Sequence, residues 1–222
     1  MKTPRKIGPV LVAALVAFQG IARAASASAG KWAVVAFDPA KTTISYKLIG
    51  WPHVSRGTFK LKSGTIRVDP ASGRMAGLIV VDAASGSSGH SIRDARMKRD
   101  VLEVRRFPEI TFAPQQVESY GHPCGESHTR VADSSTPLAC GSADAGAFPA
   151  VIRGIMALHG TTHPFTMAVT VERQGELVTI RSSFTIPYVA WGLKNPSILF
   201  FAVAKVVTVR VSAVASLSWN PS

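Results

Sequence analysis

The chain has 222 residues, a length that suits one all-β barrel or sandwich domain, and 46% of them are hydrophobic. It carries 25 Lys and Arg against 13 Asp and Glu, an excess that attracts anionic lipid headgroups, phosphates or nucleic acid unless it only keeps the protein soluble. Beyond the first residues no run reaches about 20 apolar residues, which excludes a later membrane-spanning helix.

The first residues have the pattern of a secretory signal peptide. Lys2, Arg5 and Lys6 precede an uncharged apolar stretch over residues 9–18, and the small residues Ala22 and Ala24 follow on either side of Arg23. We expect cleavage after Ala24, with a second suitable position three residues later. No Cys follows the leader closely, which argues against a lipoprotein anchor.

Removal of residues 1–24 leaves 198 residues and 21 Lys and Arg against the 13 acids, a net charge of +8. The leader predicts a periplasmic or secreted protein. Export makes nucleic acid the least expected of the anionic partners.

Period-two alternation of apolar and polar side chains is the main signal along the mature chain. From Phe165 to Glu172 every odd position is large and apolar and every even one is small or polar, which predicts a β-strand with one buried face. The same alternation occurs over 43–48, 180–186 and 207–212. Further strands are predicted near 32–37, 58–68, 77–82, 110–117 and 151–159, about nine or ten in all.

Turn residues separate these segments at 69–73, 160–162 and 174–175, and each group can close a hairpin. Many closely spaced strands with short turns indicate an all-β sandwich or barrel.

One segment departs from this alternation. Ser91–Asp94 has the S-x-x-D form of a capping box and precedes a stretch suited to a helix. We predict one short helix near residues 92–104, with Ser91 as its cap and Asp94 in a structural role. Its face toward the barrel is expected to carry Met97, Val101 and Leu102.

A long flexible insertion is predicted over residues 119–149, which are rich in Gly, Ser, Ala, Pro and Asp without periodicity, inside a single domain spanning 25–222. It contains Cys124 and Cys140, which we expect to form a disulfide after export. That bond closes a loop of about 16 residues and adds about 3 kcal/mol of stability. A metal site with His122 and His128 is the alternative, but the spacing matches no zinc pattern, so no metal or cofactor is expected.

Residues with catalytic potential are few. The serines between Ser85 and His90 lack the spacing of a nucleophile elbow, so we interpret them as a connecting loop. No phosphate loop or dinucleotide fingerprint occurs, and the acids are too scattered to indicate a glycosidase pair. His159 and His163 flank a tight turn, where a turn role is favoured over metal binding. His53 and His90 stand alone in the sequence.

The face that the alternation turns inward consists of Ile, Tyr, Leu, Phe, Met and Val. A barrel of about eight strands has room for these side chains alone or for one enclosed ligand. The residues by themselves leave both alternatives open.

Several motifs, in this order and spacing, carry a resemblance that covers nearly all of the mature chain. They are Gly57-Thr58-Phe59, residues 77–85 (GLIVVDAAS), residues 93–97 (RDARM), residues 107–112 (FPEITF) and residues 154–160 (GIMALHG). Together they resemble the YceI-like family. Two departures are the longer insertion with its cysteines and the segment 186–197, which is similar to only a subgroup.

The resemblance implies an extended antiparallel β-barrel, similar to lipocalins, whose apolar pocket holds a polyprenyl phosphate or a quinone-like isoprenoid. This favours a ligand over a filled core. The residues expected to line the pocket are Tyr46, Leu48, Phe112, Phe165, Met167, Val169, Phe184 and Ile186. Arg93, Arg96 and Lys98 are expected to meet a phosphate at the mouth, to lie on a solvated helix face, or to press the barrel transiently against an anionic membrane.

Three hypotheses follow. The favoured one is an exported carrier of an isoprenoid lipid, without enzymatic activity. The second is a hydrolase-type enzyme acting on an apolar substrate, with His53 or His90 as the base. The third is an interaction module with a closed core and a basic surface.

Overall fold

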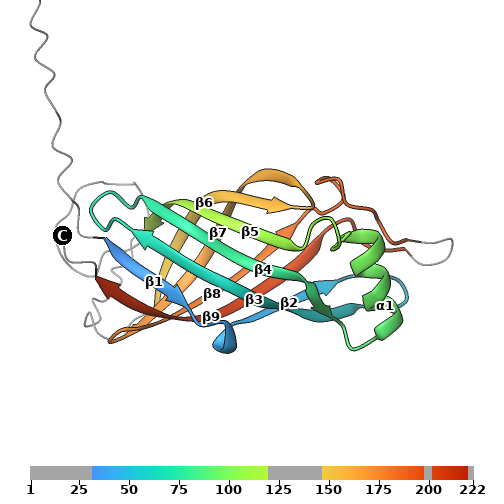
Figure 1. Ribbon diagram of the computed structural model, residues 1–222, viewed down its shortest axis with the longest axis horizontal. Coiled ribbons are helices and arrows are strands. Elements are labelled where there is room, and N and C mark those ends of the chain that lie inside the picture. The colour runs from blue at the N-terminus through green and yellow to red at the C-terminus, as the bar shows by residue number, and fades with distance from the viewer. Residues whose placement is uncertain (1–31, 120–146, 198–201, 220–222) are drawn as a thin grey trace, which may run out of the picture.

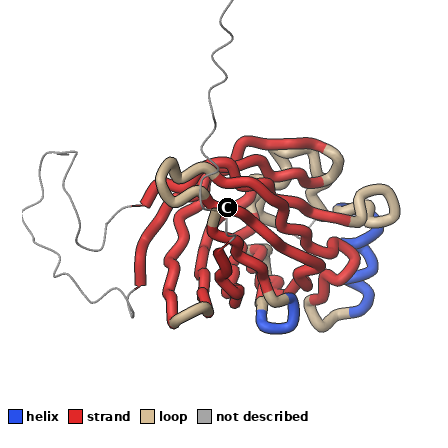
Figure 2. Tube along the Cα trace, turned by 60° about the vertical axis from the view of Figure 1, so that its left-hand side comes forward, coloured by secondary structure: helices blue, strands red, loops and turns tan. Residues whose placement is uncertain are grey.

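The computed structural model describes residues 32–119, 147–197 and 202–219, and strands make up most of this part of the chain (Figures 1 and 2). Every strand pairing is antiparallel. The strands are β1 (Ala33–Phe37), β2 (Thr43–Leu48), β3 (Ser55–Val68), β4 (Met75–Ser87), β5 (Glu109–Ser119), β6 (Ala147–Leu158), β7 (Thr161–Gln174), β8 (Leu177–Ile186) and β9 (Val207–Trp219).

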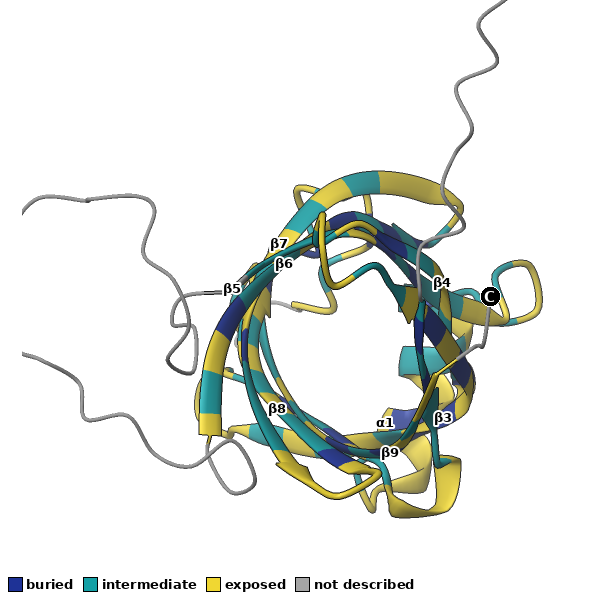
Figure 3. Cartoon of the chain, turned by 90° about the vertical axis from the view of Figure 1, so that its left-hand side faces the viewer, coloured by how far each residue is buried: buried dark blue, intermediate teal, exposed yellow. Residues whose placement is uncertain are grey.

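The sheet closes on itself as a barrel (Figure 3). β1 and β2 each pair with β3 on one side and β9 on the other, so they share one strand position, interrupted by the short helix η1 (Pro39–Lys41). The pairing of β3 with β4 completes a circuit of eight strand positions. The predicted all-β, lipocalin-like barrel is confirmed.

The connections divide between two ends of the barrel (Figure 1). At one end, called the helical end, lie the β2–β3 loop, α1 (Ser91–Arg96) and the described parts of the β8–β9 connection. The β3–β4 and β7–β8 turns lie at the opposite end, called the far end. The predicted turns at 69–73, 160–162 and 174–175 all connect paired strands.

Apolar side chains pack in two clusters inside the barrel. One, built around Leu102, Phe112, Met156 and Tyr188, gathers residues of the helical end. The other, built around Val35, Ile66, Met75 and Ala215, lies toward the far end. The alternation of side chains along each strand turns these residues inward and leaves Lys, Arg, Ser and Thr outside.

The helical segment differs from its prediction in length and in cap. α1 continues without a break into a π-helical turn, η2 (Met97–Val101), so the segment ends before residue 104. His90, not Ser91, is the N-cap residue, and its side chain makes no capping hydrogen bond. Ser91 as cap is therefore wrong, because Asp94, the other half of the expected capping box, turns back to the preceding loop instead.

Within the described ranges, no helix is both long and hydrophobic enough to cross a membrane.

The predicted insertion at 119–149 is shorter in the structure. β5 reaches Ser119 and β6 begins at Ala147, with Ala150 opposite Ser119 and Pro149 opposite Thr170. The low-complexity composition of this segment has no periodicity from which these strand ends could be predicted. The expected disulfide between Cys124 and Cys140, His122, His128 and the signal peptide over 1–24 all lie outside the described residues.

The backbone ladder between β7 and β8 covers only part of the two strands. The ladder joins Val169–Gln174 to Leu177–Ser182 and stops at the pair Val169–Ser182. Beyond it, toward the helical end, the Ser182 hydroxyl donates to the Ala168 carbonyl at 2.6 Å, and the rings of Phe165 and Phe184 meet edge to face with centroids 5.1 Å apart. We call this stretch, residues 161–168 of β7 and residues 183–186 of β8, the seam.

Candidate ligand-binding cavity

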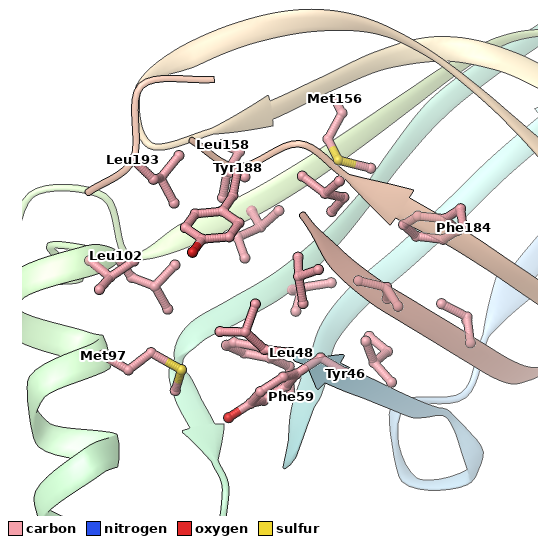
Figure 4. Close-up of a pocket in the computed structure, with 18 of the residues that line it drawn as sticks. Tyr46, Leu48, Phe59, Met97, Leu102, Met156, Leu158, Phe184, Tyr188 and Leu193 are labelled. Atoms are coloured by element: carbon pink, nitrogen blue, oxygen red, sulfur yellow. The ribbon is translucent and has the colours of Figure 1, made fainter. Parts of the chain in front are cut away.

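A cavity of about 770 Å³ runs inside the barrel from Ile66 and Met75, toward the far end, to a mouth at the helical end. This volume lies within the range of about 300–1,000 Å³ typical of small-molecule sites. Figure 4 shows its wall near the mouth, where Met97 and Leu102 lie on the helical segment opposite Tyr46, Leu48 and Phe59. The predicted helix face is therefore correct for Met97 and Leu102, and Val101 also lines the cavity.

The wall is apolar because the strands present one face of their alternation to it. β2 contributes Ile44, Tyr46 and Leu48, and β9 contributes alternate residues from Val207 to Ala213. Gly57 on β3 leaves room for the Tyr46 ring, since a Cβ at this position would lie 2.6 Å from that ring and would overlap the Ser87 carbonyl oxygen.

Most of the predicted site residues meet at this cavity. Those that line it are Tyr46, Leu48, Phe112, Met167, Val169, Phe184 and Ile186 from the strands, with Arg93 and Arg96 at the mouth. Phe165 and Lys98 do not line it.

Phe165 packs into the wall. Its ring lies edge to face against Phe112, Phe184 and Trp191, with centroids 5.1–6.3 Å apart. Trp191 belongs to the irregular segment after β8 and also stacks on His163, with centroids 4.2 Å apart. The alternation predicted the face of Phe165 correctly, but these rings enclose it within the seam.

Lys98 and Arg93 have different surroundings. Lys98 is half-buried in η2, away from the cavity, while the Arg93 guanidinium is held by the preceding loop. The Arg93 Nε donates to Ser88 Oγ at 2.8 Å, and the Arg93 Nη2 donates to the Ser88 carbonyl at 3.2 Å. These bonds fix one edge of the guanidinium at the mouth.

Asp94 is the one buried charged side chain among the described residues. The Ser88 N–H donates to Asp94 Oδ1 at 2.9 Å, and the Ser88 hydroxyl donates to the same carboxylate. Burial alone would raise the pKa of Asp94, but the hydrogen bonds from Ser88 and Ser87, with the charge of Arg93, outweigh it and lower the pKa. The carboxylate therefore ties the helical segment to the end of β4.

Two tyrosines bring polar groups to the helical part of the cavity. Burial raises the pKa of Tyr46, and the charge of Asp94 raises it further. Burial also raises the pKa of Tyr188, whose hydroxyl donates to the Ala204 carbonyl at 2.8 Å. Both phenols are neutral donors near neutral pH.

Several lining residues are absent from the predicted set. Val207, Val209 and Val211 belong to an alternating segment, so their face was available from the sequence. Tyr188 and Leu193 come from the irregular segment after β8, where no periodicity indicates burial.

Chemical groups at the mouth include both candidate bases. His53 and His90 line it, but in the described ranges neither imidazole bonds to a serine or a carboxylate. Ser85, in the segment once considered for a nucleophile, donates to the Asp82 carbonyl and accepts from the Lys60 N–H. Across the same ranges no cluster of His, Cys, Asp and Glu has the form of a metal site.

Two solved structures resemble this fold. The crystal structure of Burkholderia cenocepacia BcnA has 18% identity and a TM-score of 0.60, with 81% of this chain and 99% of that chain covered. A polyisoprenoid binding domain from Saccharophagus degradans, implicated in plant cell wall breakdown, has 13% identity and a TM-score of 0.54, with 83% and 98% covered. At these identities the likeness shows the fold alone.

No curated protein matches the sequence. The model of the YceI-like domain family matches residues 36–215, which is most of the chain. The resemblance found in the motifs is thereby confirmed, and the chain belongs to the YceI-like domain family.

Proposed function

We propose that this protein is an exported carrier that encloses one isoprenoid lipid, a polyprenyl phosphate or a quinone-like molecule, without covalent chemistry. The observation that carries the proposal is the apolar cavity of about 770 Å³ inside the closed barrel. A filled core would leave no such space, so the cavity supports a carrier over a closed-core interaction module.

Burial of the lipid tail supplies the binding free energy. Apolar surface gains about 25 cal/mol per Å² on leaving water, so about 400 Å² of tail surface is worth about 10 kcal/mol before the costs of association. The wall contributes Ile, Leu, Val, Phe and Met along its length, a lining that accepts a branched hydrocarbon without specific hydrogen bonds.

The headgroup belongs at the mouth, where the polar lining residues gather. Arg93 and Arg96 lie there beside His53, His90 and Lys194. Ser88 occupies one edge of the Arg93 guanidinium, so its remaining N–H groups are available for a phosphate or a quinone carbonyl.

Two further observations support the proposal. The S. degradans domain, which shares the fold, is described as binding polyisoprenoid. The leader pattern over residues 1–24 supports export to the periplasm or the exterior, where the carrier would also touch an anionic membrane transiently.

The test is organic extraction of the full chain, purified from its exported fraction without detergent, followed by mass spectrometry of the extract. We expect a prenyl lipid at close to one molecule per protein. Straight-chain fatty acids in its place would overturn the isoprenoid assignment. An empty protein that also takes up no polyprenyl phosphate or quinone from solution would overturn the carrier itself.

A further inference from the structure

The mouth of the cavity exposes apolar side chains to solvent. Trp51 is 72% exposed and Ile92 is 74% exposed, although both also line the cavity. Ile49, Val54 and Val206 are 57%, 40% and 48% exposed. We call these five residues the apolar rim. Among the described residues, the other large exposed hydrophobic ones, Leu78, Leu177 and Trp219, lie on β4, β8 and β9 away from the helical end.

The parts of the rim are joined by backbone hydrogen bonds. The Ala204 N–H donates to the Ile49 carbonyl and the Trp51 N–H donates to the Ala202 carbonyl, each at 2.8 Å. The β2–β3 loop therefore stands beside the chain that leads into β9, and Figure 1 shows both at the same end as α1. The rim is continuous with the lipid-binding cavity.

Exposed cations flank the apolar rim. They are Lys47, Arg56, Arg96, Lys194 and Lys205, and in the described chain none has a carboxylate within ion-pair distance. Lys47 and Arg56 are directly opposite each other on β2 and β3, a like-charge arrangement that an anionic surface would relieve.

The acids in this region are already engaged. Asp94 is buried and accepts from Ser88, and Asp100 pairs with Arg99 at 2.7 Å while also feeling the charges of Lys194 and Arg96. The surface around the mouth therefore has a net positive charge.

We infer that the apolar rim and its flanking cations dock the mouth of the barrel onto an anionic lipid bilayer. This inference rests on the proposed function, because a carried lipid whose tail entered water would lose the burial free energy that holds it. Trp51 and Ile92 enter the interfacial layer, where Trp side chains are favoured. The cations lie on the headgroups, as in surface-binding amphipathic segments. Binding to a protein partner would not depend on the charge of a lipid bilayer. A comparison of neutral with anionic vesicles therefore distinguishes a membrane from a protein partner.

The first experiment measures binding of the full chain to phosphatidylcholine vesicles with and without phosphatidylglycerol, by flotation. We expect strong binding only with phosphatidylglycerol, weakened by salt. The triple variant Lys47→Gln, Arg56→Gln, Lys205→Gln removes three cations outside the cavity lining. At about 1 kcal/mol per cation it should bind about 100-fold more weakly. Its matched control removes three far-end cations, through Arg67→Gln, Arg74→Gln and Arg173→Gln, and should bind like the wild type.

The apolar contribution is tested with residues that do not line the cavity. The variant Ile49→Ser, Val206→Ser should bind about 10-fold more weakly, whereas Leu78→Ser, Leu177→Ser should not change binding. Brominated acyl chains should quench Trp51, and the quenched fraction should disappear in Trp51→Phe. Equal effects of rim and far-end variants, or equal binding to neutral vesicles, would overturn the docking surface.

Extraction of lipid from every variant keeps the two proposals separate. Protein that contains lipid but does not bind anionic vesicles would contradict the docking surface and remain consistent with the carrier function. Protein that binds anionic vesicles through the rim but never holds lipid overturns the carrier.

Discussion

Val209 lies at the centre of the cavity wall. Val209 lies on β9, opposite Tyr46 on β2 and opposite Phe184 on β8. All three residues line the cavity. A bulky ring at this position occupies the space that the lipid needs. We expect Val209→Trp to fold and to lose most of its extractable lipid. Thr208→Trp is the matched control, since Thr208 faces outward between Lys47 and Thr185, and its lipid content should equal that of the wild type. Equal lipid in both variants would place the lipid elsewhere.

Asp94 gives a prediction about pH. Its pKa is lowered in the folded state, so its contribution to stability is complete above the unfolded value of about 3.9 and is lost as the pH falls through the folded pKa. Asp94→Asn turns an amide donor toward the Ser88 N–H and should cost about 2 kcal/mol near neutral pH.

Urea unfolding of the wild type and of Asp94→Asn across acid and neutral pH checks this. The difference in unfolding free energy should shrink in acid, because protonation removes the charge from the wild-type side chain as well. A difference that stays constant with pH would show that the Asp94 charge does not stabilise the fold.

Among the elements, the seam between β7 and β8 is a part of the barrel wall where aromatic side chains meet beyond the end of the backbone ladder. The ladder stops at Val169–Ser182, and Phe165 with its neighbouring rings closes the remainder. Phe165→Ala should destabilise the fold by about 3 kcal/mol and speed lipid release, while Phe165→Leu should cost less because it keeps most of the apolar contact.

Hydrogen exchange measures the same seam directly. Backbone amides that face β8 should exchange faster in residues 161–168 than in 169–174, and Phe165→Ala should widen the difference. Uniform protection along β7 would contradict a seam without a backbone ladder.

The elements also show what the sequence can predict. Strands with clear alternation, such as β7 and β9, were found with their correct faces, because only one face of each is buried. The strand predicted near residues 151–159 begins earlier in the structure, at Ala147 of β6, because this start follows low-complexity sequence without periodicity. The S-x-x-D pattern indicated the helix correctly but not its cap, since Asp94 has better partners in Ser87 and Ser88.

The same limits apply to the candidate site. The residues predicted from strands line the cavity, apart from Phe165, because alternation determines which face they occupy. Tyr188, Leu193 and Trp191 come from a segment without periodicity, and their positions depend on tertiary contacts such as the Tyr188–Ala204 hydrogen bond. Local pattern carries no information about such contacts.

At the scale of the whole molecule, the two ends of the barrel differ in the residues that they present. The cluster around Val35, Ile66 and Met75 packs toward the far end, while the mouth opens among cations and exposed apolar residues at the helical end. We expect the proposed lipid to enter and leave through the mouth at the helical end. The apolar rim, which is the proposed docking surface, and the cavity share Trp51 and Ile92.

Native mass spectrometry of the full chain, incubated with a polyprenyl phosphate or a prenylquinone, tests the enclosed lipid most directly. The wild type should gain the mass of one lipid molecule, Thr208→Trp should gain the same mass, and Val209→Trp should remain bare. A wild-type protein that stays bare, or a Val209→Trp variant that binds as much lipid as the wild type, would contradict a lipid held inside the barrel.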